Sequence, residues 1–196
     1  MLASYYISHV QADMIFCRTT ARCIGTNADD IMLGNNASNK IIGLNGSDTI
    51  FGFRGDDNIS GDDRADDLIG GEGNDVINGG NGSDELMGGN GDDKIYGGNG
   101  ADEIAGGGGN NVIFGDNGSD TILGGNANDV LIGGQGSDSI MGQSGNDRIY
   151  HGPIGSTASD GSKDVITCGE GNDEVWINTS IDGDEYNGQC ESIHDG

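Results

Sequence analysis

The chain has 196 residues, of which 33 are acidic, 8 are basic and 40 are glycine, and its formal net charge is −25. This length fits one domain of ordinary size. Eight scattered basic residues cannot supply the clustered positive charge that nucleic acids or an anionic membrane surface require. No run of 18 apolar residues occurs, so we predict no membrane span.

Residues 1–24 precede the regular part of the chain, which starts at Gly25. They lack the glycine spacing that follows, and they contain Cys17 and Cys23. The open end of a stacked repeat array needs a covering segment. We therefore predict that residues 1–24 form an N-terminal cap.

Residues 25–150 repeat with a period of nine. Glycine stands at every ninth position from Gly25 to Gly142, which defines fourteen consecutive nonapeptides with this glycine as position one. Position six is Asp in twelve repeats and Asn in two, and position eight is always Ile, Leu or Met. The alternative is a Gly/Asp linker that never folds. A linker would not keep an aliphatic residue at all fourteen sites, so we predict a folded repeat.

A period of nine with one aliphatic residue per unit produces no amphipathic helical face. We expect each unit to be six turn residues followed by a strand of three residues, whose middle side chain at position eight faces inward. Two units then close one coil of 18 residues, and fourteen units stack into seven coils. The sequence therefore predicts an all-β, two-sheet solenoid with a thin aliphatic core.

These nonapeptides, for example GGNGDDKIY from Gly88, resemble the RTX or hemolysin-type calcium-binding repeat, G-G-x-G-x-D-x-U-x with U a large aliphatic residue. The resemblance covers about two thirds of the chain. It implies a parallel β-roll with Ca²⁺ ions between stacked turns on both edges. Each ion would be held by backbone carbonyls of the turn and by the position-six carboxylate. Calcium chemistry agrees, because Ca²⁺ takes six to eight oxygens from carboxylates and carbonyls.

Because one coil is two repeats, the predicted ligands alternate between the two edges of the roll. On one edge they are Asp30, Asp48, Asp66, Asp84, Asp102, Asp120 and Asp138. On the other edge they are Asn39, Asp57, Asp75, Asp93, Asn111, Asp129 and Asp147. Fourteen repeats contain twelve pairs n and n+2, so we expect at most about twelve ions. Weak or missing ions are predicted beside the two amides and beside Arg64, which stands where glycine is usual.

Residues 151–196 are predicted to contain an insertion, two divergent repeats and a C-terminal cap. The register breaks at 151–158, and it resumes at 159–167 with Asp164 at position six and at 168–176 with Asp173 there. Both residues are added to the predicted calcium ligands. The stretch DVITCGEGNDEVWI followed by a terminal Cys-Glu looks like the closing segment of many secreted RTX repeat proteins.

Four cysteines permit three pairings. We predict Cys17–Cys23 and Cys168–Cys190, because each pair then lies within one terminal region and the whole solenoid separates the two pairs. Four reduced, buried thiols are the alternative. A zinc site is disfavoured, because no C-x-x-C occurs and His9, His151 and His194 have no ligand-like spacing.

We expect an extracellular calcium-binding repeat protein that folds on binding calcium and has a structural or surface role. An enzyme is not expected, because RTX enzymes append the roll to a catalytic domain, and 24 residues before the repeats and 46 after them are too few for one. The alternatives are an adhesin-like or ice- or ligand-binding solenoid, or a detached calcium-binding module of a secreted enzyme. Ice binding would need an outward ladder of threonines, which position seven lacks. Apart from calcium ions, no protein or glycan partner follows from the sequence.

Overall fold

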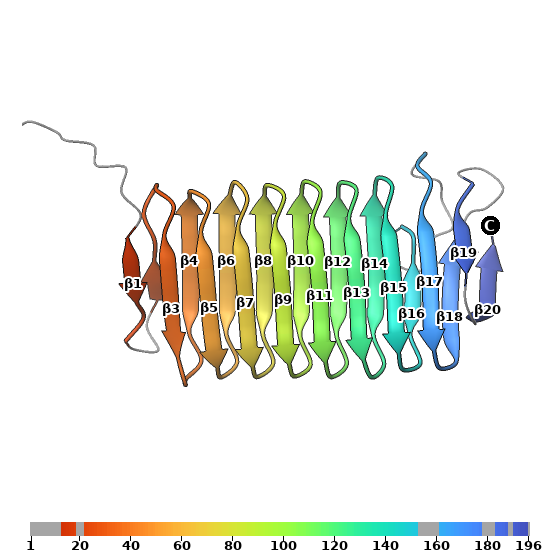
Figure 1. The fold of residues 1–196 in the computed structure, drawn as a ribbon, viewed down its shortest axis with the longest axis horizontal. Coiled ribbons are helices and arrows are strands. Elements are labelled where there is room, and N and C mark those ends of the chain that lie inside the picture. Colours follow the sequence, from red (N-terminus) through yellow and green to blue (C-terminus); the bar gives the residue numbers. More distant parts are fainter. Residues whose placement is uncertain (1–12, 19–21, 153–160, 178–182, 188–189, 196) are drawn as a thin grey trace, which may run out of the picture.

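The computed structural model describes residues 13–18, 22–152, 161–177, 183–187 and 190–195. These residues form an elongated solenoid whose strands lie side by side along the long axis (Figure 1). Among them there is no helix, and so none that is long and apolar enough to cross a membrane. The all-β, parallel fold predicted from the sequence is confirmed.

The described strands form two ten-stranded parallel sheets, and consecutive strands alternate between them. The first sheet contains β1 (Met14–Phe16), β3 (Ile31–Asn35), β5 (Thr49–Arg54), β7 (Asp67–Glu72), β9 (Glu85–Asn90), β11 (Glu103–Gly108), β13 (Thr121–Asn126), β15 (Ser139–Ser144), β17 (Val165–Glu170) and β19 (Glu185–Asn187). The second sheet contains β2 (Arg22–Ile24), β4 (Lys40–Asn45), β6 (Asn58–Asp63), β8 (Val76–Asn81), β10 (Lys94–Asn99), β12 (Val112–Asn117), β14 (Val130–Gln135), β16 (Arg148–Tyr150), β18 (Asp173–Ile177) and β20 (Cys190–Asp195).

Each strand pairs with the strand two places along the chain, which closes the 18-residue coil predicted from the period. In the regular part the register joins residues 18 apart, for example Ile50 with Leu68. After the insertion the offset grows, and Ile140 pairs with Ile166. The two sheets also extend into both terminal regions predicted as caps, since β1 and β2 add a strand to each sheet at one end and β19 and β20 do so at the other.

The strands are longer than the three residues predicted for each unit. Each strand from β4 to β15 has six residues and runs from position seven through position three of the next repeat. Pairing passes over position one and resumes at positions two and three, as in Gly98 with Asp116 and Asn99 with Asn117. The sequence pattern missed these residues because main-chain pairing of glycine and polar residues needs no apolar side chain.

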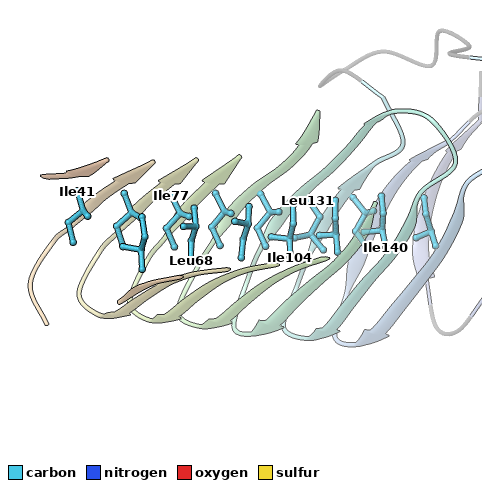
Figure 2. Close-up of a cluster of buried hydrophobic side chains, with 14 of the residues drawn as sticks. Ile41, Leu68, Ile77, Ile104, Leu131 and Ile140 are labelled. Atoms are coloured by element: carbon cyan, nitrogen blue, oxygen red, sulfur yellow. The ribbon is translucent and has the colours of Figure 1, made fainter. Parts of the chain in front are cut away.

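The core is one row of aliphatic side chains between the two sheets. Every position-eight residue of the fourteen repeats is at most 1% exposed. Figure 2 shows Ile41, Leu68, Ile77 and Ile104 following one another along the interior. Burying one such side chain contributes about 1.5–3 kcal/mol. A core that is only one side chain wide leaves the turns to be stabilised by something else.

Both terminal regions are closed by a disulfide. Cys17 is bonded to Cys23, and Cys168 is bonded to Cys190, with Cα–Cα distances of 5.6 and 5.5 Å. No free cysteine is present among the four. The pairing predicted from the sequence is confirmed, and the alternative of four reduced thiols is not what the structure shows.

Aromatic side chains at position nine stack along the outer face of the second sheet. The rings of Tyr96 and Phe114 are 5.0 Å apart, and Trp176 lies 4.4 Å from Tyr150 and 4.6 Å from His194. These contacts follow from the register, which places position-nine residues of neighbouring strands next to each other. Trp176, the single tryptophan of the chain, therefore reports on the C-terminal end of the solenoid.

Candidate metal centre

The position-six side chains form two buried columns, one along each edge of the solenoid. Each stands at the end of a turn, directly before a strand, so odd and even repeats deliver their carboxylates to opposite edges. All sixteen predicted ligands, including Asp164 and Asp173, are at most 4% exposed. Charged carboxylates are rarely buried to this extent unless a cation or hydrogen bonds compensate them.

One oxygen of each carboxylate is fixed by the backbone of the preceding coil. The Asp48 N–H donates to Oδ1 of Asp66 at 2.7 Å, and the Asp102 N–H donates to Oδ1 of Asp120 at 2.9 Å. The same bond spans the insertion, where the Asp138 N–H donates to Oδ1 of Asp164 at 2.8 Å. The columns therefore run without a break from the regular repeats into the divergent ones.

The other carboxylate oxygen, Oδ2, has no hydrogen-bond partner in a large set of these residues. Among the described residues the set contains Asp48, Asp57, Asp66, Asp75, Asp84, Asp93, Asp102, Asp120, Asp129, Asp147 and Asp173. A buried charged oxygen without a partner costs several kcal/mol, on the order of 2–7 for a polar group alone. Ca²⁺ prefers hard oxygen ligands, and carboxylate oxygens are among the commonest of them. The residues present therefore fit a calcium ion at each of these turns.

The position-one glycine lets the backbone lie close to this oxygen. A Cβ added to Gly97 would lie 2.6 Å from Asp102 Oδ2 of its own repeat and 2.6 Å from the carbonyl oxygen of Gly115 in the next coil. Any side chain at this position would occupy the space between a carboxylate and a carbonyl. The glycine therefore allows the backbone to approach a carboxylate and a carbonyl oxygen closely.

Burial raises the pKa of the position-six carboxyl groups. The pKa rises to about 7 for Asp66, Asp93, Asp120 and Asp129, and to about 6 for Asp48, Asp57, Asp84 and Asp147. Desolvation is the main cause, and charged neighbouring carboxylates add to it, whereas the backbone hydrogen bond to Oδ1 acts in the opposite direction. In the metal-free fold the groups with a pKa of about 7 are therefore partly protonated at neutral pH, and a divalent cation would displace those protons.

The two amides differ in what they present to their column: Asn39 keeps an acceptor there, since its Oδ1 lies 2.8 Å from where a Cβ on Gly34 would stand, whereas Asn111 does not. A Cβ added to Gly106 would lie 2.6 Å from Nδ2 of Asn111. At the corresponding Gly97, the atom at this distance is the carboxylate oxygen Oδ2 of Asp102. Nδ2 of Asn111 donates to the carbonyl oxygen of Gly109 at 3.2 Å. At Asn111 a donor therefore replaces an acceptor, and it engages a carbonyl of the same turn. Arg64 has a positive φ of 83° at a position that is usually glycine. The weaker ions predicted beside Asn39, Asn111 and Arg64 stay a prediction.

Sequence reasoning missed two acidic residues that continue the columns. The Asp164 N–H donates to Oδ1 of Asp184 at 3.0 Å, and the Asp173 N–H donates to Oε2 of Glu191 at 2.7 Å. Asp184 lies 20 residues after Asp164, so the period does not predict it. Glu191 lies 18 residues after Asp173, and this spacing of one coil could have predicted its place in the column.

The repeat part of the chain matches a family model, the RTX calcium-binding nonapeptide repeat, at residues 24–59, 60–95, 87–122, 96–131 and 123–153. The chain belongs to this family. RTX repeats bind calcium, so the chain is a calcium-binding repeat protein, and its position-six oxygens are the donors that the geometry offers. The curated proteins contain no match to it.

Proposed function

We propose that this chain is an extracellular RTX β-roll that folds when its turns bind calcium and that serves a structural or surface-interaction role. The observation that carries the proposal is the pair of columns of buried carboxylates, in which the Oδ2 atoms of residues such as Asp66, Asp93 and Asp102 have no hydrogen-bond partner. Repulsion between stacked carboxylates and the ordering of 32 glycines within the repeats both oppose the metal-free fold. Binding free energy then becomes folding free energy.

Two features support a location outside the cytosol. Both terminal regions are closed by disulfides, which persist in oxidising compartments. Extracellular calcium modules bind with Kd of about 10⁻⁴–10⁻³ M, so a chain of this kind folds outside cells and stays unfolded at cytosolic calcium concentrations. A non-catalytic role is part of the proposal, since the buried acidic groups are accounted for by repeated turns.

An outward threonine ladder is not formed, which disfavours the ice-binding alternative. The register of the first sheet places Thr49, Asp67, Glu85, Glu103 and Thr121 side by side at position seven. The acidic residues in the centre of this row interrupt it. An adhesin-like role remains within the proposed surface function.

Circular dichroism tests the proposal directly. Calcium titrated into EGTA-treated protein should convert a coil spectrum into a β spectrum cooperatively. Magnesium is the matched control, because it demands near-ideal octahedral geometry and gives up its water reluctantly. It should therefore leave the coil spectrum unchanged at the same concentration.

The same sample should bind at most about twelve calcium ions, counted by elemental analysis after removal of free metal. A β spectrum that is complete in EGTA, with a melting temperature that calcium does not raise, would show that calcium does not drive this fold.

A further inference from the structure

His151 stands at a place that is glycine throughout the fourteen regular repeats. Tyr150 pairs with Ile132 of the neighbouring coil, so the next residue, His151, lies opposite Gly133 at position one. In regular coils this position faces the position-six carboxylate of its own repeat at the same edge. The imidazole of His151 therefore enters the space beside the column that contains Asp138 and Asp164.

The His151 side chain is completely buried, with 0% exposure. Neither ring nitrogen has a hydrogen-bond partner among the described residues. A buried imidazole normally has at least one partner, and leaving it without one is costly. The part of the chain that the structure describes therefore leaves both ring nitrogens able to take a further ligand.

Two carboxylates converge on this ring. Nδ1 of His151 lies 3.5 Å from Oδ2 of Asp184 and 3.7 Å from Oδ2 of Asp164, and both side chains are completely buried. The three ligand atoms lie within 4.8 Å of one another. The Asp164 N–H donates to Oδ1 of Asp184, and the Asp138 N–H donates to Oδ1 of Asp164, so both carboxylates are held in place. Such outer hydrogen bonds orient metal ligands in established sites.

The geometry points to a zinc-class metal site formed by His151, Asp164 and Asp184, distinct from the calcium sites of the regular turns. Asp164, which the sequence predicted as a calcium ligand, would bind this metal instead. Two ligands of one tetrahedral zinc ion, each about 2.0–2.2 Å from the metal, lie about 3.3–3.6 Å apart. The separations from Nδ1 to the two Oδ2 atoms, 3.5 and 3.7 Å, lie within this range and 0.1 Å above it. A neutral imidazole and two carboxylates also balance the charge of a divalent cation, and one position is left for a water or a carbonyl.

The donor set separates this site from the calcium sites. Calcium takes oxygen donors, whereas imidazole nitrogen is a ligand of zinc and related transition metals. A metal here joins the residue where the chain leaves the regular repeats, His151, to the residues where it re-enters the first sheet, Asp164 and Asp184. These are the turns in which the coil is longer than 18 residues. The metal would stabilise the turns in which the nine-residue period is interrupted.

Zinc alone, titrated into the calcium-loaded full chain by calorimetry, tests the site. Excess calcium fills the regular turns and keeps the protein folded. We expect one zinc ion per chain in addition to calcium. His151→Gly, which restores the residue usual at position one, should weaken this binding by more than about tenfold, because loss of even an outer-shell partner typically costs 10–100-fold. His194→Ala, at an exposed histidine, is the matched control and should bind as the natural chain does.

A natural chain that takes up no zinc, or a His151→Gly variant that binds it equally well, would overturn the assignment. Should that variant not fold, crystals of the natural chain in calcium and zinc decide the matter without a substitution. An anomalous peak at the zinc edge between His151, Asp164 and Asp184 supports the site, and zinc found only elsewhere overturns it. The test is independent of calcium-driven folding, which circular dichroism in EGTA measures separately.

Discussion

In the middle of the solenoid, position one is glycine in every repeat from Gly25 to Gly142, whereas in the terminal regions the aligned residues are Cys17, His151, Cys168 and Ile177. In the middle, a side chain would collide with a carboxylate and a carbonyl oxygen, so the position admits only glycine. At the ends the same position carries a covalent bond, a metal-ligand candidate or a buried aliphatic group. The same backbone position therefore stays glycine where the repeat is regular, and takes a side chain where it is not.

Acidification should restore structure to the metal-free middle, and it has the largest expected effect because many carboxyl groups act together. In the folded, metal-free chain the pKa of Asp66, Asp93 and Asp120 is about 7, whereas an unfolded Asp has a pKa near 4. The folded state binds the proton more tightly. The stability that this tighter proton binding contributes to the folded state is therefore complete below about pH 4 and is lost as the pH rises through about 7.

In EGTA, lowering the pH from about 8 to about 5 should increase the far-ultraviolet β signal, following this linkage. The fluorescence of Trp176, at the disulfide-closed end, should change less. In calcium the dependence should reverse, because protons compete with the metal for the same oxygens. A metal-free β signal that falls on acidification over this range would contradict the raised pKa values.

Gly97→Ala should destabilise the calcium-loaded chain by about 3 kcal/mol, at the upper end of the usual cost of overpacking. The added methyl group would lie 2.6 Å from Asp102 Oδ2 and from a backbone carbonyl. Gly108→Ala is the control, since its nearest neighbour is a side-chain atom, Asn90 Oδ1, at 3.2 Å. Urea denaturation in excess calcium measures both variants, and equal midpoints would remove the steric role of position one.

Removing each disulfide in turn should destabilise the protein by different amounts at its two ends. Cys168→Ser should cost about 3 kcal/mol and Cys17→Ser about 2 kcal/mol, because the first bond closes the longer loop in the chain-entropy treatment. The sequence separations are 22 and 6 residues. Thermal melts followed by Trp176 fluorescence should show the larger shift for Cys168→Ser. A larger effect of Cys17→Ser on this probe would contradict the expectation.

Exchanging the acid and amide at position six should shift calcium affinity in opposite directions. Asp102→Asn removes a carboxylate with an unpaired Oδ2, whereas Asn111→Asp adds one where Nδ2 now donates to Gly109. The calcium midpoint of folding should rise roughly threefold to tenfold for the first and fall for the second, since ligand charge tunes such sites. Calcium titrations followed by circular dichroism provide the midpoints. Shifts in the same direction would show that charge at this position does not set affinity.

The regular part of the fold was predictable because every contact in it is a translation of the one before. A constant spacing of nine residues placed the aliphatic row, the two carboxylate columns and the 18-residue coil, and the structure contains all three. The cysteine pairing followed from the same plan. Strand length was not predictable, because the main-chain pairing at positions such as Gly98 and Asn99 has no hydrophobic signature.

The sequence by itself determined the period, the inward residue and the alternation of edges, since these depend only on spacing along the chain. Tertiary structure decided what happens where the spacing fails. His151 and Asp184 are 33 positions apart and share no motif, yet sheet register brings Nδ1 of one to 3.5 Å from Oδ2 of the other. Tertiary structure also decided how the two oxygens of each column carboxylate differ. One oxygen accepts a hydrogen bond from a backbone N–H, whereas the other has no hydrogen-bond partner in most of the column. The spacing predicts which residues recur, whereas the packing of the coils determines which of their atoms can bind a metal.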